Sequence, residues 1–128
     1  MHRRMNAHHA VVWIDHNEAR IFKFTGESVA EVDVHAKPHA HVHNRKAASG
    51  RHDEDEKYYA AVIDALADAN EFLVVGPSTA KLHLVKLLTT RHSQLGSRLI
   101  GVETVDHPTD GQIVAYAKKY FVAADRMR

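Results

Sequence analysis

The segment Glu71–Lys81, with the sequence EFLVVGPSTAK, decides the fold of this 128-residue chain. Phe72–Val75 are consecutive apolar residues, a pattern typical of a strand that is covered on both faces. Gly76 and Pro77 then indicate a sharp turn into a helix, because glycine tolerates unusual backbone angles and proline favours the first helical turn. The segment therefore predicts a central strand that leads directly into a helix.

The turn after this strand is also a candidate anion-binding site. A helix N-terminus offers free backbone N–H groups and the positive end of the helix dipole, and open α/β sheets commonly bind anions there. Hydroxyl side chains at this position are expected to cap the helix. A plain β–α connection without a ligand explains the same residues. The candidate residues are Gly76, Ser78, Thr79 and Lys81.

The residues before this segment predict three strands and one helix. In the third strand Glu31 and Asp33 lie on one face, opposite the inward Ala30, Val32 and Val34, which suits an edge strand. Apolar residues at helical spacing from Tyr59 to Leu66 then predict an amphipathic helix. The expected strands are residues 10–14, 19–24 and 28–34, and the expected helix is 53–70.

The residues after the central strand complete an α/β fold. We expect a helix over 79–94, a strand over 98–104 and a helix over 110–124, with Thr109 and Gln112 as a capping box. Tight turns make the first three strands antiparallel, whereas helical crossovers make the last two parallel to the first. The result is one domain over 1–128, a three-layer sandwich with a mixed five-stranded sheet in the order 3-2-1-4-5 and ribonuclease-H-like topology, β-β-β-α-β-α-β-α.

Residues 36–52 differ in composition from the rest of the chain. They contain no acid and only one sizeable apolar residue, which predicts a mobile loop. Cations on such a loop neutralise phosphates, and arginine also stacks on unpaired bases, so the loop is a candidate RNA contact. A solvated loop without a ligand is the alternative. The candidate residues are Lys37, Arg45, Lys46, Arg51, His39, His41 and His43.

Two groups of residues are candidate metal sites. On an extended segment His39, His41 and His43 point the same way and could share a zinc ion, but such tracts often bind metal adventitiously. Asp15, at the end of the first strand, could serve a two-metal nuclease, but that chemistry needs several convergent carboxylates. We expect Asp15 to accept backbone N–H groups in a turn. The sequence thus predicts no metal site, no cofactor and no catalytic residue.

The composition also bears on the chemistry that the chain can carry and on its location in the cell. The chain has no cysteine, which excludes disulfides and thiolate chemistry. It has no apolar run long enough to cross a membrane and no signal-like hydrophobic region at its start. We therefore expect a cytoplasmic protein with no membrane partner.

Two segments, VVWIDHNEARIF and FLVVGPSTAK, resemble the middle domain of archaeal and eukaryotic class-1 release factors and Pelota. The chain is also similar to small bacterial release-factor-like proteins known as translational machinery proteins. The resemblance covers about residues 11–121 and includes the motif positions Asp15, Ala19, Gly76, Pro77 and Lys81. It implies a translation-associated module whose partner is the ribosome or a structured RNA.

The chain departs from the release-factor pattern in the loop after the third strand. Release factors carry Gly-Gly-Gln there, which promotes ester hydrolysis in the peptidyl-transferase centre, whereas residues 44–51 read NRKAASGR. The pair Gly111-Gln112 lies elsewhere and fits the capping box. We therefore expect a binding module without peptidyl-tRNA hydrolysis. The alternatives are a metal-dependent phosphoesterase or nuclease using Asp15 and the histidine loop, and an interaction module that forms a homodimer through its edge strand.

Overall fold

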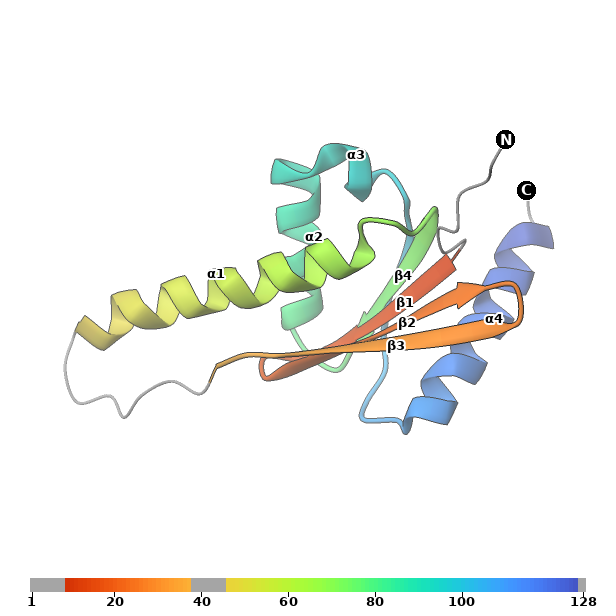
Figure 1. The fold of residues 1–128 in the computed structure, drawn as a ribbon, viewed down its shortest axis with the longest axis horizontal. Coiled ribbons are helices and arrows are strands. Elements are labelled where there is room, and N and C mark those ends of the chain that lie inside the picture. Colours follow the sequence, from red (N-terminus) through yellow and green to blue (C-terminus); the bar gives the residue numbers. More distant parts are fainter. Residues whose placement is uncertain (1–8, 38–45, 127–128) are drawn as a thin grey trace.

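The computed structural model describes residues 9–37 and 46–126, with the backbone alone for 46–54. One five-stranded sheet has the order β3-β2-β1-β4-β5 (Figure 1), which confirms the predicted topology. β1 pairs antiparallel with β2 and parallel with β4. The strands are β1 (His9–Ile14), β2 (Glu18–Thr25), β3 (Ser28–His35), β4 (Glu71–Gly76) and β5 (Leu99–Thr104).

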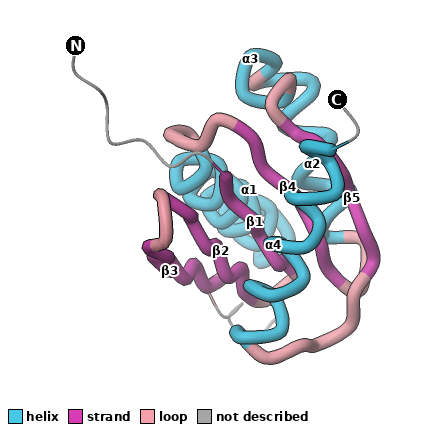
Figure 2. The backbone as a smooth tube through the Cα atoms, turned by 90° about the vertical axis from the view of Figure 1, so that its right-hand side faces the viewer, coloured by secondary structure: helices cyan, strands magenta, loops and turns pink. Residues whose placement is uncertain are grey.

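Helices cover both faces of the sheet (Figure 2). One core cluster joins the sheet to α1 and α2, and a second joins its other face to α4. Residues alternate between the clusters along β1, so that Val12 belongs to the first and Trp13 to the second. The helices are α1 (Lys46–Leu66), α2 (Ala80–Arg91), the single-turn α3 (Ser93–Gly96) and α4 (Asp110–Arg126).

The central strand β4 is buried on both faces, as its unbroken apolar run predicts. Phe72 and Val74 pack toward α1 and α2, whereas Leu73 and Val75 pack toward α4. Full burial of such a side chain contributes roughly 1.5–3 kcal/mol. Gly76 ends the strand next to β1, where an added Cβ would clash with the carbonyl oxygen of Ile14. Glycine is therefore required here for close approach of two backbones.

The start of α1 differs from the predicted one. The sequence predicts a helix at 53–70, whereas α1 spans Lys46–Leu66, so residues 46–52 of the predicted loop are helical. Low apolar content does not disfavour a helix, and Ala47 and Ala48 are strong helix formers. Residues 38–45 lie outside the described part of the chain.

Two smaller expectations also need correction. The helix expected over 79–94 is divided at His92, whose φ of −137° and ψ of 56° interrupt the helical backbone between α2 and α3. Ala30, expected to face inward, is exposed, because this end of the edge strand β3 extends past the covering helix. Val32 and Val34 do pack against the first core cluster.

None of the helices in the described part of the chain combines the length and the apolar character needed to cross a lipid bilayer.

Candidate functional site

The loop after β1 is organised by Asp15, as predicted. Asp15 Oδ1 accepts hydrogen bonds of 2.8 Å from the backbone N–H groups of both Asn17 and Glu18. The hydroxyl of Tyr58 on α1 donates a 2.8 Å hydrogen bond to the carbonyl oxygen of Asp15. Asp15 is thus a turn-forming residue, and the prediction of local amide bonds is confirmed.

A cleft opens beside this loop, between α1 and α2, and we call it the α1–α2 cleft. Its volume is about 430 Å³, and His16 Nε2 lies 3.2 Å from Thr79 Oγ1 at its edge. Cationic and anionic groups both contribute to the lining, so the cleft carries mixed charge. The lining residues are His16, Asp55, Glu56, Tyr59, Thr79, Leu82, His83 and Lys86.

Tyr59 lines the α1–α2 cleft and is buried. Its ring lies 4.5 Å from that of His83, measured between centroids. Burial, followed by the charges of Asp55 and Asp15, raises the pKa of Tyr59 to about 12. Tyr59 is therefore a neutral phenol at physiological pH and offers a hydrogen-bond donor rather than a nucleophile.

Several of the predicted anion-binding residues already contact other groups of the protein. Lys81 is 7% exposed, and its Nζ donates a 2.6 Å hydrogen bond to the carbonyl oxygen of Ser78, so the ammonium group faces backbone. Thr79 occupies the N-cap of α2, but its hydroxyl makes no capping hydrogen bond. The expected capping by Thr79 is wrong because its hydroxyl contacts His16 instead. Gly76 serves strand packing, and anion binding stays a prediction.

A second set of polar residues lies at the same end of the sheet, on the face that α4 covers. The guanidinium carbon of Arg20 lies 4.5 Å from the centroid of the Trp13 ring, and its Nη1 lies 2.7 Å from Asp110 Oδ1. Trp13 Nε1 donates a 2.8 Å hydrogen bond to the carbonyl oxygen of Asp106. These contacts fasten the loop between β5 and α4 to the sheet, so their first role is structural.

His107 belongs to this set and was missed as a functional candidate in the sequence. Its Nδ1 lies 2.9 Å from Asp106 Oδ1, and its Nε2 lies 3.8 Å from Asp15 Oδ2. The neighbouring pair Asp106-His107 was the only local signal, since the approach of Asp15 depends on the fold. Asp15 belongs to no group of three or more potential metal ligands in the described ranges 9–37 and 46–126.

Two of the predicted RNA-binding residues, Lys46 and Arg51, belong to the first half of α1, which extends past the sheet (Figure 1). Tyr58 is the first buried residue of the helix among those with described side chains. Residues 46–57 form a projection about 18 Å long at the usual helical rise. We call these residues the projecting end of α1.

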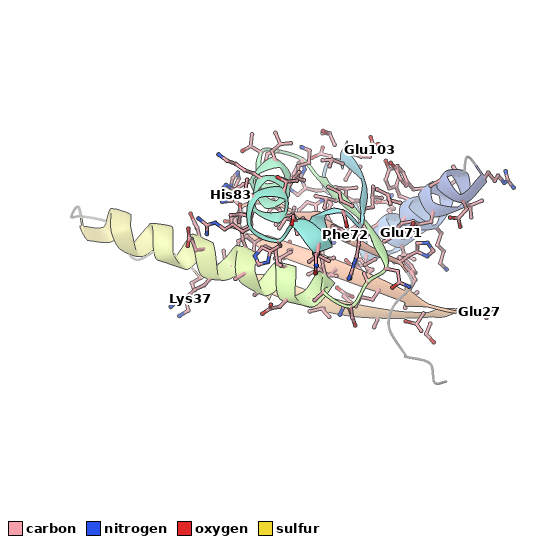
Figure 3. All side chains as sticks on the ribbon, turned by 90° about the horizontal axis from the view of Figure 1, so that it is seen from above. Glu27, Lys37, Glu71, Phe72, His83 and Glu103 are labelled. Carbon is pink, nitrogen blue, oxygen red and sulfur yellow. The ribbon has the colours of Figure 1, made fainter. Side chains whose placement is uncertain are left out.

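Lys46 and Arg51 lie on the projecting end, although their side chains are not described. Lys37 is exposed, and Figure 3 shows it toward the same end of the molecule as His83 of the α1–α2 cleft. The remaining candidates, Arg45, His39, His41 and His43, lie outside the described residues. Their contact with RNA stays a prediction.

The outer edge of β3 is open and carries an acidic pair. A side-chain hydrogen bond with Asp33, then desolvation and the charge of Asp33, raise the pKa of Glu31 to about 7. Two β3 strands that paired with each other would bring such carboxylates together, and like charges on adjacent strands are unfavourable. The homodimer through β3 stays a prediction.

Comparison with known proteins shows a likeness in structure but not in sequence. No protein-family model and no curated protein sequence matches the chain. Solved structures do: the Pelota proteins of Archaeoglobus fulgidus (TM-score 0.58, 15% identity, 89% of this chain) and Thermoplasma acidophilum (TM-score 0.56, 19% identity, 85% of this chain). The archaeal translation termination factor aRF1 is similar over 93% of this chain, with a TM-score of 0.54 and 15% identity.

The chain resembles Pelota and release-factor proteins in fold. The predicted resemblance is thereby confirmed at the level of the fold. This chain covers only 31% of each Pelota structure and 38% of the aRF1 structure. At these identities the likeness establishes the arrangement of the strands and helices, and it leaves function to be argued from the residues.

Proposed function

We propose that this chain is a translation-related, release-factor-like module that binds the ribosome or a structured RNA without hydrolysing peptidyl-tRNA. The observation that carries the proposal is the projecting end of α1. Its first residues, 46–52, belong to the basic, acid-free segment 36–52 of the sequence, and the acids Asp53–Glu56 follow them on the same helix. The fold is shared with Pelota and aRF1.

The charge distribution supports nucleic acid as the partner. Residues 36–52 carry four Lys/Arg residues and four histidines with no acid among them. Lys37 is exposed at one end of this segment, where β3 has ended. Binding of phosphates by such cations releases counterions, which makes the affinity depend on salt.

The absence of Gly-Gly-Gln supports a module that binds without hydrolysis. The only Gly-Gln pair, Gly111-Gln112, lies at the start of α4. Gln112 Oε1 accepts the N–H of Thr109, and Thr109 Oγ1 accepts the N–H of Gln112, so this glutamine caps a helix. We expect no peptide release from stalled ribosomes, as measured with labelled peptidyl-tRNA. Release that is lost on Gln112→Ala would contradict this expectation.

The experiment that tests the proposal is co-sedimentation with ribosomes at two salt concentrations. The variant Arg45→Ala/Lys46→Ala/Arg51→Ala removes three cations from the proposed interface. If each contacts a phosphate, the slope of log K against log salt should fall by about 2–3. The melting temperature should change little, because substitutions outside a core usually cost below about 0.5 kcal/mol.

A matched control removes the same charge from another surface. Lys118, Lys119 and Arg126 are exposed on α4, on the opposite side of the sheet from α1. The variant Lys118→Ala/Lys119→Ala/Arg126→Ala should retain the salt slope of the parent chain. Equal losses in the two triple variants would show a general charge effect and remove the projecting end from the proposal.

Binding should also depend on pH. Imidazoles with an ordinary pKa of about 6.5 become cations as the pH falls from 7.5 to 6, so affinity for phosphates should rise. Replacing His39, His41 and His43 by Gln should abolish this rise if the three histidines are responsible. The affinity at pH 7.5, where they are mostly neutral, should change little.

A further inference from the structure

We propose that His9, Glu71 and Asp125 form a binding site for a divalent transition-metal cation, and that zinc is the cation it suits best. One donor atom from each residue lies within 4.8 Å of the other two. The site lies at the amino end of the central strands, where β1 and β4 begin. It is independent of the proposed RNA interface, which lies at the carboxyl end.

Three separate elements bring the donors together. His9 opens β1 and Glu71 opens β4, and the two are direct partners in the parallel register of these strands. Asp125 lies near the end of α4, one helical turn after Phe121. Figure 3 shows Glu71 beside α4. The juxtaposition therefore depends on the whole sheet and on the packing of its C-terminal helix.

The distance between the first two donors matches the separation of two ligands on one cation and is longer than a charge-assisted hydrogen bond. His9 Nε2 and Glu71 Oε1 are 3.4 Å apart. A charge-assisted N–H···O hydrogen bond measures about 2.7–2.9 Å. Two ligands at about 2.0–2.1 Å from a tetrahedral zinc are themselves separated by about 3.3–3.4 Å.

The histidine is held in place by packing. Its ring lies 4.2 Å from the ring of Phe121, measured between centroids, and Phe121 is buried in the second core cluster. The side chains of His9 and Glu71 are each 27% exposed, which leaves an entry path for an ion. A rigid histidine beside two reachable carboxylates loses little conformational freedom on binding metal.

The donor set determines the class of cation. One imidazole nitrogen and two carboxylates suit zinc and related first-row cations, whereas magnesium and calcium prefer sites made of oxygen alone. Three protein ligands leave a fourth tetrahedral position for water. The expected consequence is a link between the end of α4 and the two central strands.

The test is zinc titration of the full chain by calorimetry, without an affinity tag. The sequence contains a second histidine group, His39, His41 and His43, so the parent for the titration is the variant in which all three are Gln. We expect one zinc per chain in this parent. Zinc at 100-fold above its dissociation constant should raise the melting temperature by on the order of 10 °C.

Single substitutions in this parent identify the ligands. His9→Gln and Asp125→Asn should each weaken zinc binding at least tenfold and remove the thermal shift. Asp125 is exposed, so its variant keeps the test valid if His9→Gln folds poorly. His107→Gln is the matched control, because His107 also lies beside an aspartate, at 2.9 Å, and should leave zinc binding unchanged.

Three outcomes would overturn the proposal. Absence of zinc binding in the parent would show that His9 and Glu71 form only an ion pair. Unchanged binding in both His9→Gln and Asp125→Asn would place the ion elsewhere. An equal loss in His107→Gln would show a nonspecific effect of removing histidine.

Discussion

The two ends of the central strands differ in what their polar side chains contact. At the carboxyl end polar side chains bond to backbone groups. Asp15 accepts hydrogen bonds from two backbone N–H groups, and Tyr58 and Lys81 each donate one to a backbone carbonyl oxygen. At the amino end the donors of His9, Glu71 and Asp125 converge on one another.

These contacts suggest different roles for the two ends of the central strands, namely anchoring of loops at the carboxyl end and binding of an ion at the amino end. Polar groups that satisfy backbone partners stabilise turns and have little capacity left for a ligand. At the carboxyl end these contacts anchor the loop after β1 to α1, and the proposed RNA binding involves the projecting end of that helix. At the amino end side chains from three elements face one another, which is the arrangement that an ion requires. The following predictions test this division.

The largest expected loss of stability follows from a substitution at the close contact between β1 and β4. Gly76→Val places a side chain against the carbonyl oxygen of Ile14, and the backbones must separate to accept it. We expect a loss of about 3 kcal/mol or more in the free energy of unfolding, measured by chemical denaturation.

Gly111 supplies the control for this prediction. A Cβ at Gly111 meets nothing within 4 Å, and the residue lies in the first turn of α4. Gly111→Ala should be neutral or stabilise by up to about 1 kcal/mol. A Gly76→Val variant as stable as Gly111→Ala would refute the packing role of Gly76.

A smaller loss of stability is expected from a substitution where α1 contacts the loop after β1. Tyr58→Phe removes the donor to the Asp15 carbonyl while keeping the buried ring, and should cost about 0.5–1.5 kcal/mol. Burial, with the charge of Asp15 second, raises the pKa of Tyr58, so the phenol stays protonated throughout the physiological range. Denaturant titration of the two proteins measures the difference, and no loss would show that the anchor is dispensable.

At the amino end, substitution should cost little stability when metal is absent. Glu71→Gln removes the ion pair with His9, and partly exposed pairs contribute about 0.2–1 kcal/mol. Measuring the free energy of unfolding with and without a chelator separates the contribution of the ion pair from that of bound metal. A loss in chelator as large as that of Gly76→Val would show that the cluster anchors the fold.

The smallest expected effect on stability is in the edge strand β3, where it is detected by titrating Glu31. Glu31 should titrate near pH 7, and Asp33→Asn should lower this value, as followed by NMR of the side-chain carboxyl. The folded pKa exceeds the ordinary value of 4.5, so the pair favours the folded state below pH 4.5 and loses this contribution as the pH rises through 7. Glu31 is largely exposed, so solvent screening keeps the contribution small. Titration near 4.5 would exclude the hydrogen bond with Asp33.

Local patterns predicted most of the secondary structure because their causes are local. The Phe72–Val75 run became a strand buried on both faces, and Thr109 with Gln112 formed the reciprocal capping bonds. The start of α1 was misplaced because Lys46–His52 has helix propensity but no apolar stripe to reveal it. Thr79 failed as a cap because His16, from a different part of the chain, contacts its hydroxyl.

By itself the sequence determined the strand order, the basic segment 36–52 and the absence of Gly-Gly-Gln, since these depend on neighbouring residues and on short connections. Tertiary structure alone decided the juxtaposition of residues 9, 71 and 125 and the approach of His107 to Asp15. The physical reason is that a side-chain cluster depends on strand register and helix placement together. No spacing along the chain encodes a distance across three packed elements.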